Sequence, residues 1–246
     1  MVALLLPKRR TTQPQTPVGI DWSNPMTRGL IGAYLPCGSY ANLVGIGGTL
    51  TPLTTPPATI ISPIGSAFAH LSGSSALYAP VYGTPFTTST NGYSIFWAGQ
   101  VISASVVGPY NSLILGICYG NADTPPYISY GLESNNTGIY AGAGSNGGIT
   151  SPISRVQGAT YTIGASFDTA GNVMTYNKGI LVESINYGAI PFSTSATLAF
   201  GGYIGDSSRS PNVNSALGLV FNRVLTAVEH TMIAANPWQL FSPGVS

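Results

Sequence analysis

Alternating apolar and polar positions are clearest in the second half of the chain. Residues 161–167 place Tyr, Ile, Ala and Phe at every second position, with Thr, Gly and Ser between them. This period of two is typical of a β-strand that buries one face. Residues 168–172 and 177–179 are rich in Asp, Asn and Gly, which favour turns. The pattern therefore predicts two consecutive hairpins, whose later strands cover 173–176 and 180–184.

Further strands are predicted at the spacing of a β-sandwich. Residues 93–101 carry large apolar groups on both faces and are predicted to lie in the middle of a sheet. Residues 216–222 alternate large apolar residues with small or polar ones, which predicts a half-buried strand. The other predicted strands cover residues 29–34, 66–70, 75–78, 112–119, 127–132, 138–143 and 197–203.

One segment near the C-terminal end has the pattern of a helix. Thr226 and Glu229 have the spacing of a capping box, in which each side chain accepts a hydrogen bond from the other residue's N–H. A short helix is therefore expected over 227–235, and Asn236 and Pro237 should end it because proline disfavours helix at the preceding residue. The residues expected on its apolar face are Val228, Met232 and Ala235.

Composition agrees with an all-β fold and adds one unusual property. The 246 residues include 31 Gly and 19 Pro, which favour short strands joined by many turns. Charged residues make up 6% of the chain, against roughly 25% in ordinary soluble domains, and the net charge is +1. Such an uncharged surface suits either a robust free-standing monomer or a subunit whose faces are covered by neighbours in an assembly.

The first 27 residues differ in composition from the rest. They contain four prolines and a Thr/Gln run without periodicity, so neither strand nor helix is predicted there. The chain is divided into an extended arm, 1–27, and a domain, 28–246, and Trp22 is expected to be a packing anchor that fastens the two together. The residues predicted to dock on a partner are Leu4, Leu5, Leu6, Lys8, Arg9, Arg10 and Trp22. The alternative is a disordered tail.

The same end of the chain bears on localisation. A secretory signal has its positive residues before a longer apolar core, whereas here a short apolar run comes first. No apolar run approaches the roughly 18 residues of a membrane span. We therefore expect a protein that is made and kept in the cytoplasm, is not secreted and has no membrane partner. Cys37 and Cys118 are the only cysteines and are expected to be free thiols.

Several motifs lie near the two ends of the chain and in its hairpins. Asp21–Pro25 precedes the first predicted strand, turns with Asp-x-x-Gly and Asn-Lys-Gly fall within 168–179, and Asn-Pro-Trp-Gln-Leu-Phe occupies 236–241. Together these segments resemble LamG-like, concanavalin A-like jelly rolls of tailed phages over about residues 20–241. One departure is Lys178, which separates an Asn and a Gly that are adjacent in the family.

The resemblance implies a fold, a role and partners. The implied fold is an all-β, two-sheet antiparallel jelly-roll sandwich of the concanavalin A-like type, with the extended N-terminal arm and one short C-terminal helix. The implied role is a non-enzymatic structural protein of a phage virion. Such a decoration or cement subunit docks on capsid or tail proteins through its arm and uncharged surface, and it forms homo-oligomers. The expected location is the virion, after synthesis in the host cytoplasm.

The alternative function is a carbohydrate-binding receptor module of a tail fibre or spike, with a host-surface glycan as its partner. Aromatic rings that stack on sugars would supply such binding, and the candidate glycan contacts are Tyr127 and Tyr130. Tyrosines in strands and turns also bridge the core and water, which is the structural interpretation of the same residues.

Catalytic chemistry has little support in the sequence. Jelly-roll glycoside hydrolases need two carboxylates across the scissile bond, and laminarinase-type enzymes of this fold supply them from a Glu-x-Asp-x-Glu strand. None of the seven acidic residues lies two positions from another, and only Glu133 and Glu183 have no evident structural task. We therefore expect no enzyme, and a hydrolase is the least favoured hypothesis.

No cofactor is predicted. His70 and His230 are isolated in sequence and are expected to pack or to face solvent. Calcium has only weak candidate ligands, which are Asn121, Asp123 and Glu133. The G-x-G-x-x-G match at 142–147 leads into no helix, so we expect a flexible loop there and no nucleotide site. The single basic cluster at 8–10 is too small to predict nucleic-acid binding.

Overall fold

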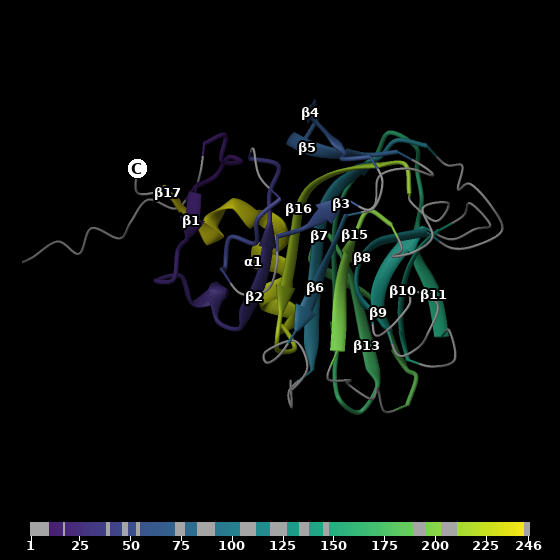
Figure 1. Ribbon diagram of the computed structural model, residues 1–246. Coiled ribbons are helices and arrows are strands. Elements are labelled where there is room, and N and C mark those ends of the chain that lie inside the picture. The colour runs from purple at the N-terminus through teal and green to yellow at the C-terminus, as the bar shows by residue number, and fades with distance from the viewer. Residues whose placement is uncertain are drawn as a thin grey trace, which may run out of the picture.

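The computed structural model describes residues 10–16, 18–37, 40–45, 49–52, 55–71, 77–82, 92–103, 112–118, 127–132, 138–144, 148–188, 195–202 and 211–243. Within these ranges only the backbone is described at 78–82, 112, 118, 127–132, 138–144, 148–152, 195–197 and 243. The chain is an all-β jelly-roll sandwich of two antiparallel sheets, with one short α-helix packed on the outside (Figure 1). The fold class predicted from the sequence is confirmed.

The sheet beneath the helix has eight strands, in the order β14-β13-β12-β7-β16-β5-β4, with β2 also paired to β16. Its strands are β2 (Leu30–Tyr34), β4 (Ala58–Ser62), β5 (Gly65–His70), β7 (Tyr93–Val101), β12 (Thr160–Phe167), β13 (Asn172–Asn177), β14 (Ile180–Asn186) and β16 (Val213–Phe221). The predicted central strand, β7, lies between β12 and β16, and its bounds are those expected.

The opposite sheet has seven strands, in the order β11-β10-β9-β8-β15-β6-β3. They are β3 (Thr51–Pro52), β6 (Leu77–Tyr82), β8 (Ser112–Cys118), β9 (Tyr127–Leu132), β10 (Gly138–Gly144), β11 (Gly148–Ser154) and β15 (Ser195–Phe200). β11 was not predicted, and the flexible loop expected at 142–147 is wrong at 142–144, which belong to β10. β10 and β11 instead pair as an antiparallel hairpin.

A first hydrophobic core fills the space between the two sheets. It includes Trp97 of β7, Phe68 of β5, Ile163 of β12 and Phe200 of β15, and all four side chains are fully buried or nearly so. The Trp97 indole N–H donates to the hydroxyl of Ser215 at 2.9 Å, so its polar atom is satisfied inside the core.

A second core lies on the outer face of the eight-stranded sheet, between that face and the C-terminal segment. Leu217, Leu219 and Phe221 of β16 pack there with Ile233 of α1 (Ala227–Ala235) and with Leu240. β16 is therefore buried on both faces, since its other residues face the first core. The prediction of a half-buried strand is wrong because the helix and the chain ends cover the second face.

The N-terminal segment joins this second core. β1 (Val18–Ile20) pairs antiparallel with β17 (Phe241–Pro243), and a short 3-10 helix, η1, covers Pro25–Thr27. The expectation that no strand or helix precedes residue 28 is therefore wrong. Gln13 is buried and donates to the Ser66 carbonyl at 2.7 Å. The division at residue 28 and the docking role of the arm stay predictions, and residues 1–9 lie outside the described part of the chain.

Helix α1 begins and ends where the sequence predicted, but it buries a different face. The capping box is present, with Thr226 and Glu229 bonded in both directions. Val228 and Met232 are exposed, whereas His230 and Ile233 are buried. The predicted apolar face is wrong because the buried face includes a histidine whose polar atom bonds to the sheet. A second 3-10 helix, η3 (Pro237–Leu240), follows and was not predicted.

Candidate functional site

The outer face of the seven-stranded sheet brings together several tyrosine positions. Leu115 and Ile117 of β8 and Leu198 and Phe200 of β15 belong to the core between the sheets. Strand residues alternate between faces, and paired residues in neighbouring strands share a face. The register therefore assigns the alternate positions to the outer face, and the tyrosines among them are Tyr78, Tyr82, Tyr127 and Tyr140.

Small residues occupy the strands between these tyrosines. The outer-face positions on β8, β9, β10 and β15 include Gly116, Ser129, Gly142, Gly144, Thr197 and Ala199. Tyr127 shares a row with Cys118, Thr197 and Pro80, and Tyr78 and Tyr82 flank that row. Three strand spacings separate β9 from β6, about 14 Å. Leu113 and Ala199 on this face have no exposed surface, so the face is not open to solvent at these two positions.

The two tyrosines predicted to contact a glycan fall on different faces. Tyr127 pairs with Cys118 of β8, at an outer-face position. Tyr130 pairs with Leu115, which belongs to the core between the sheets. A ligand on the outer face would therefore lie on the same side of the sheet as Tyr127 and on the opposite side from Tyr130. Their side chains are outside the described part of the structure.

The predicted docking residues can be placed only in part. Leu4, Leu5, Leu6, Lys8 and Arg9 lie outside the described residues. Arg10 is half-buried, and its carbonyl accepts a hydrogen bond from Asn236 at 2.7 Å beside the end of α1. Trp22 is 60% exposed, so its expected role as a packing anchor is wrong. Met26, four residues later, is buried in the second core and fastens this segment.

A shallow hollow lies on the helix side of the molecule. Its volume is about 330 Å³. It forms where the end of α1 leaves the outer face of β12 uncovered, and it is lined by Ile64, Thr160, Tyr161, Thr162, Lys178, Thr231, Ala234 and Ala235. The exposed ammonium of Lys178 and the threonine hydroxyls could bind a small polar ligand. Lys178 itself has a positive φ of 52°, since the β13–β14 hairpin turn needs a left-handed residue there.

A buried histidine network joins α1 to the eight-stranded sheet. His230 Nε2 lies 2.8 Å from the Ser166 hydroxyl, which lies 2.8 Å from the Ser94 hydroxyl, and Ser94 donates to the Arg223 carbonyl. The imidazole stacks on Tyr176 with 3.8 Å between ring centroids. His230 Nδ1 has no partner, so the proton belongs on Nε2, from which it is donated to Ser166.

Burial is the largest influence on the acidity of this imidazole. It lowers the pKa of His230 to about 4, with Glu229 opposing and Arg223 adding to the effect. The ring is neutral at ordinary pH and closed to solvent. The network therefore docks the helix on the sheet. His70, the other histidine, packs against Phe68 and Phe200, as the sequence predicted.

Three of the four described carboxylates, those of Asp21, Asp168 and Glu229, accept structural hydrogen bonds. Asp21 accepts from Ser23, Asp168 accepts from Asn172, and Glu229 accepts from Thr226 and pairs with Arg223 at 2.6 Å. The hydrogen bond from Arg223 is the largest of the effects that lower the pKa of Glu229 to about 2. Glu183 is half-buried on β14. Among the described acids, no pair flanks a cleft as glycoside hydrolysis requires.

Metal and membrane features are also limited. The described residues contain no group of three or more His, Cys, Asp or Glu side chains placed to hold a metal. Asn121, Asp123 and Glu133, the candidate calcium ligands, lie outside them. Cys37 is a half-buried free thiol. In the described part of the chain, no helix has the length and apolar character of a membrane span.

Comparison with known proteins gives matches among solved structures. No family model and no curated protein matches the chain. Domain 4 of AbnA, a GH43 extracellular arabinanase from Geobacillus stearothermophilus solved with arabinotriose, is similar with a TM-score of 0.60 and 20% identity. The match covers 83% of this chain and 98% of that one.

Botulinum neurotoxin binding domains are also similar. The binding domain of neurotoxin DC in complex with rat synaptotagmin II matches with a TM-score of 0.62 and 12% identity, covering 84% of this chain and 51% of that chain. The same domain in complex with SialylT matches with a TM-score of 0.63 and 13% identity, covering 85% and 52%. This chain thus spans about half of the toxin binding domains. At these low identities the structural matches show a shared fold alone, and the phage-type resemblance stays a prediction.

Proposed function

We propose that this chain is a non-catalytic binding module whose ligand is a carbohydrate. The observation that carries the proposal is the set of tyrosine positions on the outer face of the seven-stranded sheet, separated by small residues. Aromatic rings present an apolar face and a polar tip, the combination that a sugar ring with its hydroxyls requires. The similar structures solved with arabinotriose and with SialylT support the class of ligand.

The test is a matched pair of tyrosine variants on one strand. The intact protein is first screened on a glycan array that includes arabino-oligosaccharides and sialylated glycans, and the best ligand is then titrated by calorimetry. Tyr127→Ala, on the outer face, is expected to weaken binding about tenfold, the equivalent of about 1.4 kcal/mol. Tyr130→Ala, on the inner face, should lower the melting temperature and leave the affinity of the folded protein within about twofold.

Two results would contradict the proposal. One is the absence of any glycan that binds the folded protein at millimolar concentration. The other is an equal loss of affinity in the two variants, because of these two residues only Tyr127 occupies an outer-face position. Measurable turnover of a bound polysaccharide would contradict the non-catalytic part alone.

A second candidate is a structural subunit of a phage virion, made in the host cytoplasm and docked on other virion proteins. The charge content of 6% favours it, because neighbouring subunits can cover an uncharged surface at little desolvation cost. The test is the presence of the protein in purified particles. Deletion of residues 1–9 removes the apolar residues Leu4, Leu5 and Leu6, here called the apolar tip. It keeps Gln13 and β1, which pack in the fold. Normal incorporation of this truncated chain would contradict docking through the tip.

A further inference from the structure

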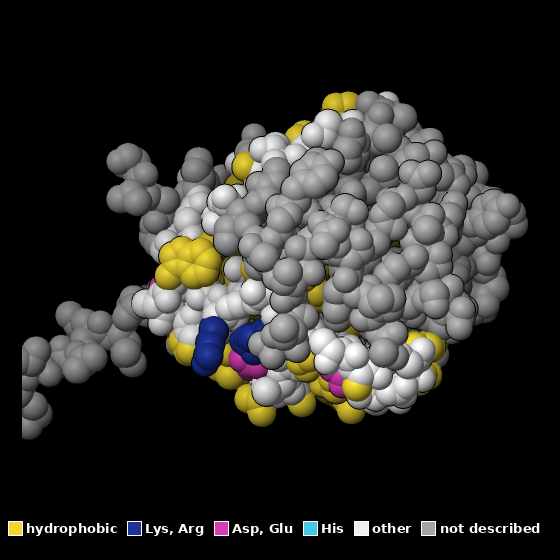
Figure 2. Space-filling view, turned by 60° about the horizontal axis from the view of Figure 1, so that its bottom comes forward, with side chains coloured by type: hydrophobic (Ala, Val, Ile, Leu, Met, Phe, Trp, Pro, Cys, Tyr) yellow, Lys and Arg dark blue, Asp and Glu magenta, His cyan; other side chains and the backbone are white. Residues whose placement is uncertain are grey.

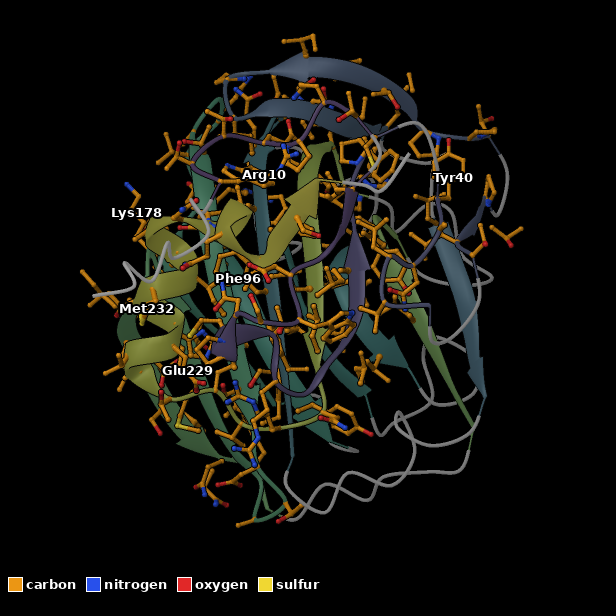
Figure 3. The ribbon with its side chains drawn as sticks, turned by 90° about the vertical axis from the view of Figure 1, so that its left-hand side faces the viewer. Arg10, Tyr40, Phe96, Lys178, Glu229 and Met232 are labelled. Carbon is orange, nitrogen blue, oxygen red and sulfur yellow. The ribbon has the colours of Figure 1, made fainter. Side chains whose placement is uncertain are left out.

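An apolar surface is exposed at one edge of the eight-stranded sheet. It consists of three side chains of β14 and two of α1, which are Ile180, Leu181, Val182, Val228 and Met232. The helix and the hairpin are joined by the Thr231 hydroxyl, which donates to the Gly179 carbonyl at 2.9 Å. Lys178 at the hairpin and Met232 on the helix lie on the same side of the molecule (Figure 3). We call these five residues the β14 edge surface.

The other three edge strands of the two large sheets, β3, β4 and β11, contain or adjoin proline. β3 contains Pro52 and β11 contains Pro152, while β4 lies between Pro57 and Pro63. Proline removes a backbone donor and protects an edge from pairing with another chain. β14 is seven residues long and contains neither proline nor lysine. β14 ends the strand order of its sheet, so no described strand pairs along its outer side.

We propose that a second copy of this chain occupies the β14 edge surface by antiparallel pairing of β14 with β14. Two identical strands related by a twofold axis present the same donors and acceptors to each other, so the contact closes after two copies. The net charge of +1 gives the copies little mutual repulsion. Figure 2 shows hydrophobic side chains along the lower rim of the molecule, with Lys or Arg and Asp or Glu side chains beside them.

The size of the surface also fits a pair of copies. The five side chains are 39–69% exposed, and together they expose roughly 500 Å² per copy, or roughly 1,000 Å² in two copies. This exposed apolar area is close to the roughly 1,200 Å² at the low end of specific interfaces. Lys178 and Glu183 lie toward opposite ends of the exposed stretch, so antiparallel pairing brings unlike charges toward each other. The proposal does not depend on glycan binding.

The test is the oligomeric state of the full chain, measured by sedimentation velocity and light scattering over a range of concentrations. The chain has a mass of 25.4 kDa, and the expected species is a dimer of twice that mass. Leu181→Lys should raise the dimer dissociation constant at least about tenfold, because it places a charge in the apolar contact. The matched control is Ile61→Lys on β4, the opposite edge strand, where the side chain is 80% exposed. This control should remain dimeric.

Two further measurements keep the proposal testable if Leu181→Lys unfolds. Val228→Lys lies on α1 outside the sheet and should weaken the dimer in the same direction. In the unaltered chain, hydrogen exchange at the β14 amides should slow as the concentration rises, while exchange at β4 stays constant. A chain that stays monomeric at all concentrations would overturn the proposal and leave the surface to a different protein. A dimer that survives Leu181→Lys and Val228→Lys in folded protein would overturn it as well.

Discussion

Acid should destabilise this protein through one buried imidazole. Burial lowers the pKa of His230 from its ordinary 6.5 to about 4, so the folded state holds the ring neutral. As the pH falls, the unfolded chain takes up a proton near pH 6.5, before the folded chain can. Stability that is present above pH 6.5 is therefore lost progressively between pH 6.5 and about 4.

The size of this loss follows from the two pKa values. The full difference is worth about 3 kcal/mol of unfolding free energy once the pH is below both. Between pH 7.5 and 5.0 the expected loss is about 2 kcal/mol. Glu229 contributes little in this window, because its pKa is lowered from 4.5 to about 2 and its own loss occurs as the pH falls below 4.5.

The assay is urea unfolding of the unaltered protein and of His230→Gln at pH 7.5 and 5.0. A glutamine amide can still donate to Ser166 but does not titrate. The variant should be less stable at pH 7.5, and its loss between the two pH values should be smaller by about 2 kcal/mol. All other titrating groups are the same in both proteins, so the difference isolates His230. Equal losses in the two proteins would refute the reasoning.

Three further substitutions test local features of the fold by urea or thermal unfolding. Thr226→Ala removes the capping hydroxyl and should cost about 1 kcal/mol, whereas an unchanged stability would show that the cap is not formed. Met26→Ala should cost about 2–5 kcal/mol and Trp22→Ala at most about 0.5 kcal/mol, and the reverse order would contradict the packing of the N-terminal segment. Lys178→Asn should stabilise the protein by up to about 1 kcal/mol, because asparagine tolerates a positive φ better; a clear loss would count against the turn geometry.

Features fixed by short-range chemistry could be predicted from the sequence. The bounds of β7 and α1 match the expected ones because an apolar run, a capping box and a proline determine them locally. β1 and β17 were not predicted, since each is three residues long and gains its hydrogen bonds from a partner at the other end of the chain. No local sequence pattern indicates such a pairing.

The face on which a side chain lies depends on partners that are distant in sequence, so it could not be predicted from local patterns. His230 is buried because Ser166, 64 residues away in sequence, supplies its hydrogen bond, and this displaces Val228 and Met232 to the surface. The tyrosines were recognisable as residues that suit sugar binding. Their grouping needs the register of five strands, which separates Tyr127 from Tyr130 and adds positions on β6 and β10.

β16 has a consequence for how the molecule comes apart. Val213 and Val220 belong to the core of the sandwich, Leu217, Leu219 and Phe221 belong to the core under the helix, and the backbone of β16 pairs with β2, β5 and β7. If α1 and the chain ends unfolded, the outer face of β16 would be exposed to water, although the sandwich depends on the same strand for its own core. Helix and sandwich should therefore unfold together on heating, in a single cooperative transition.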